Sequence, residues 1–187
     1  MTGAAYAGKG VGVDEHDKPA VAEAADPALS ELFQPTHVIP ELKATTREGV
    51  ISEVVKQVAQ RGLVSDAKWL ETALTERERM VPTAMPNGVA FLHARHRAAE
   101  KFPKQFLFLA RSSKGVAFGS PDERPTNLFF LLALRKDMAH LRWLARLSWI
   151  CRNRTTVANL LKVAGPEEIA RALRLAVEEL PGNLRQK

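Results

Sequence analysis

The early part of the chain has hydrophobic positions at helical spacing, which predict two consecutive helices. In the first helix, apolar side chains three or four positions apart share one face: Val50, Ile51, Val54, Val55 and Val58. Thr45 and Glu48 have the spacing of a capping box at its start, and Gly62 marks its end. Ser65 or Asp66 then opens the second helix.

Beyond these helices the pattern changes to short continuous apolar runs, which are typical of buried strands. Asn87 and Gly88 indicate a loop, and residues 89–92 predict a strand that ends at His93. The apolar run at residues 127–134 predicts a central strand, because a strand covered on both faces shows no polar alternation.

A second pair of strands and a helix complete this region. Residues 105–110 and 116–118 are predicted to pair as a hairpin around residues 112–115. Asp137 is expected to cap a helix that ends near Cys151.

The C-terminal part returns to helical spacing. A short helix carries Val157, Leu160 and Leu161, and a last helix opens at Gly165 with Pro166 in its first turn. The order of helices, strands and again helices predicts an α/β fold, a three-layer α/β/α sandwich with a central mixed sheet.

The N-terminal residues differ in charge from the rest of the chain. Residues 1–31 hold two lysines and six acidic residues, so they carry −4 in a chain whose net charge is +6. Residues 1–27, rich in alanine, glycine and charge, are predicted to form a disordered tail, and the folded domain is expected over residues 28–183. The basic charge of the chain is concentrated in residues 135–154, which hold six Lys or Arg and one Asp.

Composition excludes several classes of protein. Hydrophobic residues make up 45% of the chain, which is enough for a core, and the single cysteine excludes an internal disulfide framework. The apolar run at residues 128–134 has seven residues, far fewer than the roughly 20 that cross a membrane. No signal-peptide core is visible near the N-terminus, so we expect a cytoplasmic protein.

Candidate chemistry centres on two histidines and one arginine. His93 follows a predicted strand, and the carboxyl ends of strands in α/β sheets are where ligand-handling groups collect. His140 falls in the first turn of the helix after the central strand, where free N–H groups favour an anion. Together with Arg77 they would suit a transferable phosphoryl group. A plain polar histidine, and a simple ion pair between Arg77 and Glu78, are the alternatives.

The segment around these residues resembles the phosphorylation motif of type-2 enzyme IIA domains of the phosphotransferase system, the fructose, mannitol and nitrogen-regulatory type. Its matching residues are Arg77, Glu78, Thr83, Asn87, Gly88, Val89, Ala90 and His93. Downstream, residues 127–134, the segment from His140 to Leu147, and the helix start at Glu167 are also similar to the family pattern. The resemblance spans approximately residues 30–180.

This resemblance implies a phosphocarrier. His93 would accept a phosphoryl group from an HPr-type carrier and pass it to a IIB partner, or use it as a regulatory signal. His140 would orient the phosphohistidine, Arg77 would steady its charge, and Thr83 would contact the phosphoryl oxygens. Neither a metal nor an organic cofactor is implied, since such transfer depends on positioning and electrostatics.

The sequence also departs from the family pattern, which leaves two other functions open. Leu92 and Ala94 flank His93 where the family has proline and glycine, and Ala84 and Pro86 stand where it has loop glycines. These departures favour a phosphotransfer-deficient, IIA-like module that binds a regulated protein. The basic cluster at residues 135–154 raises a nucleic-acid-binding function, which we do not expect because no nucleic-acid motif accompanies it.

Overall fold

A five-stranded mixed sheet runs through the middle of the protein. The computed structural model describes residues 27–95 and 98–185. The strands, in their order across the sheet, are β1 (Val38–Ile39), β4 (Phe106–Val116), β5 (Thr126–Ala133), β3 (Val89–Leu92) and β2 (Ala84–Met85). β1 is parallel to β4 and β3 to β5, whereas the other neighbouring pairs are antiparallel. The long central strand predicted near residues 127–134 is thus confirmed as β5.

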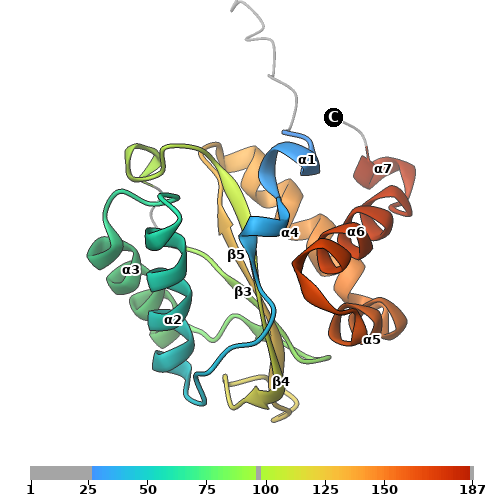
Figure 1. Ribbon diagram of the computed structural model, residues 1–187, viewed down its shortest axis with the longest axis horizontal. Coiled ribbons are helices and arrows are strands. Elements are labelled where there is room, and N and C mark those ends of the chain that lie inside the picture. Colours follow the sequence, from blue (N-terminus) through green and yellow to red (C-terminus); the bar gives the residue numbers. More distant parts are fainter. Residues whose placement is uncertain (1–26, 96–97, 186–187) are drawn as a thin grey trace, which may run out of the picture.

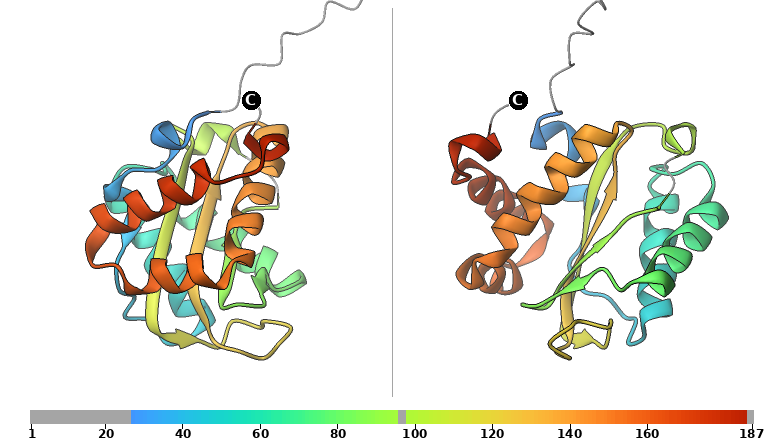
Figure 2. Two further views of the ribbon diagram at one scale, coloured as in Figure 1. Left: turned by 90° about the vertical axis from the view of Figure 1, so that its right-hand side faces the viewer. Right: turned by 180° about the vertical axis from the view of Figure 1, so that it is seen from behind.

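Helices cover both faces of this sheet. On one face lie α2 (Arg47–Gln60) and α3 (Ala67–Met80), and on the other lie α4 (Asp137–Arg152), α5 (Arg154–Lys162) and α6 (Gly165–Glu178) (Figures 1 and 2). The predicted three-layer α/β/α sandwich is therefore confirmed. Short turns of helix complete the chain: α1 (Leu29–Leu32), α7 (Gly182–Arg185), and the 3-10 turns η1 (Pro35–His37) and η2 (Ala99–Lys101).

Alternating side chains of the strands feed two separate hydrophobic cores. In β4, Phe106 and Phe108 pack in the core under α2 and α3, whereas Leu107 and Leu109 pack in the core under α4, α5 and α6. This alternation follows from the two-residue period of a strand. Because both faces are covered, every residue of β5 except Asn127 is buried, which explains the apolar run in the sequence.

The helix starts differ from the prediction by one residue. Thr46, not Thr45, is the N-cap of α2, because its backbone is extended and its hydroxyl accepts a hydrogen bond from the Gly49 N–H at 3.1 Å. Asp137 is the first residue of α4 rather than its cap, which is Lys136. Asp66 is confirmed as one of the two predicted starts, since it accepts from the Trp69 N–H at 2.9 Å.

The predicted hairpin around residues 112–115 is wrong. Arg111 pairs with Leu128 and Val116 pairs with Thr126, so both halves of β4 run along the same neighbour, β5. The intervening residues bulge outward opposite Asn127. Gly115 has a φ of 72°, which lets the chain resume its direction after the bulge instead of reversing.

Part of the basic cluster at residues 135–154 is structural. Arg135 donates to the carbonyl oxygens of Phe102 and Pro103. Arg146 is buried, lies over the Trp143 ring at 4.9 Å and donates to the Leu184 carbonyl oxygen. The buried Arg146 is therefore not part of an exposed basic face that would bind nucleic acid, whereas Arg135 is exposed but its guanidinium is engaged by two carbonyl oxygens.

Two sequence-based expectations concern the ends of the chain and membranes. The tail predicted over residues 1–27 lies outside the described residues except for Pro27. None of the helices in the described part of the chain has the length and apolarity to cross a membrane.

Candidate functional site

His93 lies at the carboxyl edge of the sheet, directly after β3. Leu92, the last residue of β3, pairs in register with Leu131 of the parallel strand β5. The strand residues before the histidine are fully buried, whereas the imidazole itself is half-buried. The strand therefore fixes the backbone while the ring stays within reach of a partner molecule.

The two ring nitrogens of His93 have different partners. Nδ1 lies 2.7 Å from the Phe91 carbonyl oxygen, and Nε2 lies 3.2 Å from Nε of Arg77. A carbonyl oxygen only accepts a hydrogen bond, so Nδ1 carries the proton, and a guanidinium only donates, so Nε2 offers its lone pair. Both contacts therefore select the same neutral tautomer, in which Nε2 is the nucleophilic atom.

Arg77 reaches the histidine from the last turn of α3. Its Nη1 also donates to the Val81 carbonyl oxygen at 2.6 Å, just past the helix end. One guanidinium thus links the end of α3 to the imidazole. Arg77 does not pair with Glu78, which was the alternative interpretation. Arg77 donates to His93, and the carboxylate of Glu78 binds Thr83.

His140 approaches from the opposite side of the site. It lies in the first turn of α4, is buried, and its ring centroid is 5.2 Å from that of His93, with the two planes tilted by 57°. The N-cap residue Lys136 makes no side-chain capping hydrogen bond. The helix therefore brings the positive end of its dipole to the same place as the second imidazole, and Asp137 in its first turn lies at that end too.

Thr83 is held by Glu78 instead of pointing its hydroxyl hydrogen into the site. The Thr83 hydroxyl donates to Oε1 of Glu78, and the Thr83 N–H donates to Oε2 at 2.9 Å. Burial raises the pKa of Glu78, which is 2% exposed, and the hydrogen bonds from Thr83 act in the opposite direction. The Thr83 carbonyl oxygen also accepts from the Phe91 N–H, so Glu78 ties the loop to the strand that carries His93.

The sequence thus predicted the neighbours of His93 more accurately than the contacts of the loop. Of the four candidate residues, the structure brings Arg77, His93 and His140 together and engages the side-chain donor of Thr83 elsewhere. Glu78 was identified from the sequence as a motif residue, but its role in anchoring Thr83 was missed. Its position four residues after the buried Leu74 on the inward face of α3 is the signal that would have found it.

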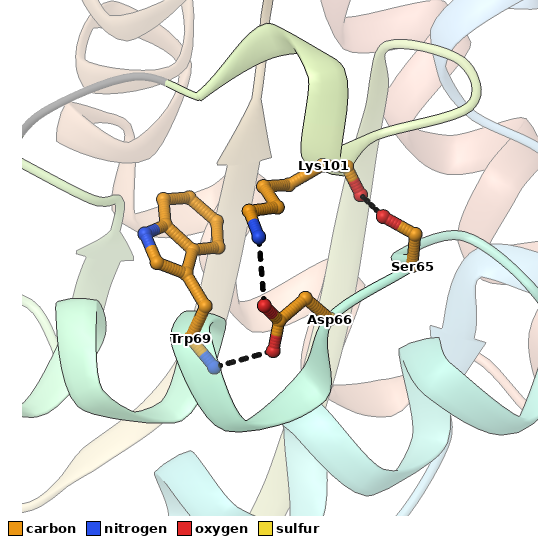
Figure 3. A network of polar contacts seen from close by, with 4 residues as sticks. All are labelled: Ser65, Asp66, Trp69 and Lys101. Carbon is orange, nitrogen blue, oxygen red and sulfur yellow. Dashed lines mark hydrogen bonds and ion pairs between the residues drawn. The ribbon is translucent and has the colours of Figure 1, made fainter.

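The segment that leaves the site is fixed at its far end. In Figure 3, Lys101 of η2 donates to Oδ2 of Asp66 at 2.8 Å, and its carbonyl oxygen accepts from the Ser65 hydroxyl at 3.0 Å. Asp66 at the same time caps α3 through the Trp69 N–H. Because α3 also carries Arg77, this one helix is linked both to His93 and to the η2 turn that follows it in the chain.

Exposed apolar side chains flank the site, and sequence reasoning missed them. Met80 and Val81 follow the turn of Arg77, and Met138 and Leu141 flank His140 in α4; all four are at least half exposed. Nη1 of Arg95 lies 3.6 Å from the Met80 sulfur. We call these four apolar residues the apolar rim. Such clustered exposure is typical of a surface that contacts another protein.

The described residues include no group of three or more His, Cys, Asp or Glu side chains placed to hold a metal ion. Cys151 is buried in the core beneath α4, and burial raises its pKa to about 12, so its thiol is unreactive. The structure brings the histidine pair and Arg77 together at this edge of the sheet.

Comparison with solved structures agrees with this fold. The nitrogen regulatory protein IIA-Ntr of Neisseria meningitidis is 22% identical, has a TM-score of 0.68, and is matched over 76% of this chain and 97% of its own. Enzyme IIA for mannitol of Escherichia coli, solved in complex with phosphorylated enzyme IIB, is 20% identical with a TM-score of 0.66, over 76% of this chain and 96% of its own.

Sequence comparison places the chain in a family. A nitrogen regulatory protein of Bradyrhizobium diazoefficiens is 28% identical over 134 residues, which cover 71% of this chain and 85% of that protein. Residues 31–175 match the family model described as phosphoenolpyruvate-dependent sugar phosphotransferase system, EIIA 2. Because this match includes most of the chain and the whole site described above, the protein belongs to the EIIA 2 family of the phosphoenolpyruvate-dependent sugar phosphotransferase system.

Proposed function

We propose that this protein is a cytoplasmic phosphocarrier in which Nε2 of His93 accepts a phosphoryl group from an HPr-type donor. The group then passes to a IIB-type partner, or its presence serves as a regulatory signal. Two relatives support these two outcomes, since one is solved in complex with a phosphorylated IIB enzyme and another is a nitrogen regulatory protein. The observation that carries the proposal is the pair of ring contacts of His93, with Nδ1 at the Phe91 carbonyl oxygen and Nε2 at Arg77, from which we infer that Nε2 offers its lone pair.

The transfer step needs only this lone pair. Nε2 attacks the phosphorus of the donor's phosphohistidine, a new N–P bond forms, and the donor's N–P bond breaks with its electron pair returning to the donor nitrogen. The His93 ring then gains positive charge while Nδ1 keeps its proton. The Phe91 carbonyl oxygen, 2.7 Å from Nδ1, accepts that hydrogen bond throughout and stabilises the charge.

Arg77 changes partners in this step. Before transfer its Nε donates to the lone pair that attacks, at 3.2 Å, so it must move aside as the phosphorus arrives. A phosphoryl oxygen bonded to Nε2 would then lie within reach of the same guanidinium, which suits a planar donor. His140 and the N-terminus of α4 would contact the group from the other side. In this proposal no metal or organic cofactor takes part.

The apolar rim offers the contact area for the partner carriers. Donor and acceptor must each bring a reactive atom to within bonding distance of Nε2, so their surfaces must cover the residues beside it. Met80 and Val81 on one side and Met138 and Leu141 on the other are exposed apolar groups that such a contact would bury.

A regulatory module without phosphotransfer is the second candidate. Leu92 and Ala94 beside the histidine favour it, because they depart from the family pattern at the nucleophile itself. The loop departures favour it less. Ala84 lies in β2 and pairs with Ala90, and the left-handed positions of the β2–β3 turn are Asn87 and Gly88, so the loop meets its backbone needs without further glycines.

Phosphate labelling separates the two candidates. The protein is incubated with labelled phosphoenolpyruvate, enzyme I and HPr from the same organism, and the nitrogen-branch carrier is tested in parallel. A phosphocarrier becomes labelled, the label is acid-labile and base-stable, and His93→Ala abolishes it while the control His16→Ala keeps it. Absence of label on a folded wild-type protein with both carriers would overturn the proposal and leave the binding module.

A further inference from the structure

A basic groove lies at the end of β3 opposite to the end that leads to His93, and the proposed phosphotransfer does not use this groove. Its volume is about 390 Å³. It is formed between the bulge of β4, the turn from β2 to β3, and the start of α5. The residues that carry the argument are Asn87, Lys114, Arg124, Asn127, Arg154 and Leu161.

The irregular backbone of this edge shapes the groove. The bulge that replaces the expected hairpin carries Lys114, and the Asn127 side chain stabilises the bulge by donating to the Ser112 carbonyl oxygen at 2.8 Å. Across from it, Asn87 has a φ of 81° and Gly88 a φ of 74°. Asparagine adopts this left-handed backbone more readily than most residues, and the Asn87 side chain lies with Nδ2 3.5 Å from the Cys151 carbonyl oxygen.

The cations at the groove have little acidic compensation. Lys114, Arg124 and Arg154 line it, and no acidic residue in the described part of the chain does. Arg124 forms an ion pair with Asp122 at 3.9 Å, which offsets part of its charge. For Lys114 and Arg154, the structure gives no ion pair with any residue in the ranges 27–95 and 98–185. Three cations around one hollow repel one another, and an anion between them would relieve that repulsion.

Arg154 strengthens this argument by its place in the helix. It is the first residue of α5, and the first turn of this nine-residue helix contains no acidic residue. A helix N-terminus carries partial positive charge, so a cation is unfavourable there and an anion is favourable. Asn153 caps the helix by accepting from the N–H groups of Thr155 and Thr156, so the helix adds only its dipole to the positive potential that Arg154 brings to the groove.

The remaining lining is apolar or carries amides. Leu161 and Val157 of α5 and Pro125 form an apolar wall, and the side chains of Asn87 and Asn127 supply amide groups beside it. A site of this size with an apolar wall and a few polar groups is typical of small-molecule binding. Nδ2 of Asn127 already donates to the Ser112 and Ser113 carbonyl oxygens, and Nδ2 of Asn87 to that of Cys151. The two amide oxygens can therefore accept from the amino edge of a planar ring, and cations pair with phosphate.

From this combination we propose that the basic groove binds a nucleotide-sized phosphate ester. Its phosphate contacts Lys114, Arg124 and Arg154, and its ring packs on Leu161 between the two amides. Gly88 and His93 stand at opposite ends of β3, about 16 Å apart at ~3.3 Å per residue. A ligand in the groove therefore leaves the nucleophile accessible.

Calorimetric titration of the full chain tests this proposal. The probes are AMP and ATP, with adenosine, ribose 5-phosphate and inorganic phosphate as partial ligands. We expect the nucleotides to bind more tightly than any of the three partial ligands, and more weakly as salt is raised. The double variant Lys114→Gln, Arg154→Gln should weaken nucleotide binding at least about tenfold. Both side chains are exposed, so the variant should remain folded.

Two control variants show whether the groove itself binds the nucleotide. Arg171→Gln removes one exposed cation from α6, away from the groove, and should bind nucleotides like the wild type. His93→Ala should do the same, so a failure of the proposed phosphotransfer would not affect this result. The proposal is overturned if neither nucleotide binds the wild type, if phosphate alone binds as tightly as the nucleotides, or if the double variant binds them equally well.

Discussion

The proposed reactivity of His93 depends on two hydrogen bonds of its ring. The Phe91 carbonyl oxygen fixes the proton on Nδ1, and Arg77 marks the position of the Nε2 lone pair. The guanidinium is held in place by the Val81 carbonyl oxygen, so in the proposed transfer it would need to move only a short distance to contact a phosphoryl group on Nε2. We therefore expect Arg77 to act mainly in the transition state.

Replacing Arg77 tests this role. Arg77→Ala should slow phosphoryl transfer to His93 by about 10²–10³-fold, the usual effect of removing one donor that stabilises transition-state charge. Arg77→Lys should recover only part of the rate, because an ammonium cannot contact the ring or phosphate and the Val81 carbonyl oxygen in the same fork geometry. Single-turnover labelling measures these rates.

Arg79→Ala is the matched control for this experiment. Arg79 lies two residues further along α3, is exposed and faces a different side of the helix. It should change the rate far less than Arg77→Ala. Equal effects of both substitutions would mean that only the overall positive charge matters, which contradicts the specific role of Arg77.

Glu78 predicts a pH dependence of stability. Burial raises its pKa in the folded protein, so the folded state binds this proton more tightly than the unfolded chain does. The contribution to stability is therefore complete below about pH 4.3, the ordinary pKa of a glutamate, and is lost as the pH rises through the raised value. Glu78→Gln should remove this dependence, as measured by urea unfolding between acidic and neutral pH.

The control for this measurement is Glu76→Gln, an exposed glutamate of the same helix. It should leave the pH profile unchanged. If the wild type and Glu78→Gln have parallel profiles over the whole range, the pKa of Glu78 is not raised by folding, which contradicts this prediction.

Single residues of the site were only partly predictable from the sequence. The motif predicted that Arg77 and His140 lie beside His93, because helix ends and strand ends meet at one edge of an α/β sheet. It did not predict that the Thr83 hydroxyl donates to Glu78, because the direction of a hydroxyl depends on a buried acceptor that only the folded chain provides.

Among the elements, the start of α2 offers a test between two neighbouring residues. Thr45 and Thr46 both have a chemically suitable side chain, but only Thr46 accepts from the Gly49 N–H. Thr46→Ala should lower the free energy of unfolding by about 1 kcal/mol, the usual cost of losing an N-cap. Thr45→Ala should change it by less than about 0.5 kcal/mol. Chemical denaturation of both variants decides which residue is the cap.

The bulge of β4 shows why local sequence misled about one element. Residues 112–115 contain the serines and glycine that are typical of a hairpin turn. The same residues also suit an outward bulge, and the choice depends on a partner far along the chain. Asn127 supplies it, because its amide donates to the Ser112 carbonyl oxygen and fills the gap in the ladder.

In the molecule as a whole, Arg111 joins two layers. Its Nε donates to the Pro40 carbonyl oxygen after β1, and its Nη1 lies within hydrogen-bonding distance of three carbonyl oxygens at the end of α5, those of Leu160, Leu161 and Val163. One side chain of the sheet therefore satisfies the C-terminal carbonyl groups of a helix in the neighbouring layer.

Removing this link should destabilise the fold. Arg111→Met keeps much of the side-chain volume but leaves these carbonyl groups without their charged donor, so we expect a loss of roughly 2–4 kcal/mol in the free energy of unfolding. Arg171→Met, on the exposed face of α6, is the comparison and should lie within about 0.5 kcal/mol of the wild type. Equal stability of the two variants would contradict the linking role.

The layers themselves were predictable because they depend on periodicity. The helical stripe of Val50, Val54 and Val58, and the apolar run of β5, each show which faces are covered. Links such as that of Arg111 were not predictable, because they join residues about 50 positions apart and leave no local pattern.

The most direct test of the proposed mechanism is to identify which ring nitrogen of His93 becomes phosphorylated. The hydrogen bonds of this histidine predict that it is Nε2. After phosphorylation of protein labelled with ¹⁵N in its histidines, nuclear magnetic resonance coupling between ³¹P and the ring nitrogens identifies the bonded atom. We predict that phosphorus is bonded to Nε2 of His93 and that Nδ1 keeps its proton. A phosphoryl group on Nδ1, or on a different histidine, would contradict the proposed mechanism.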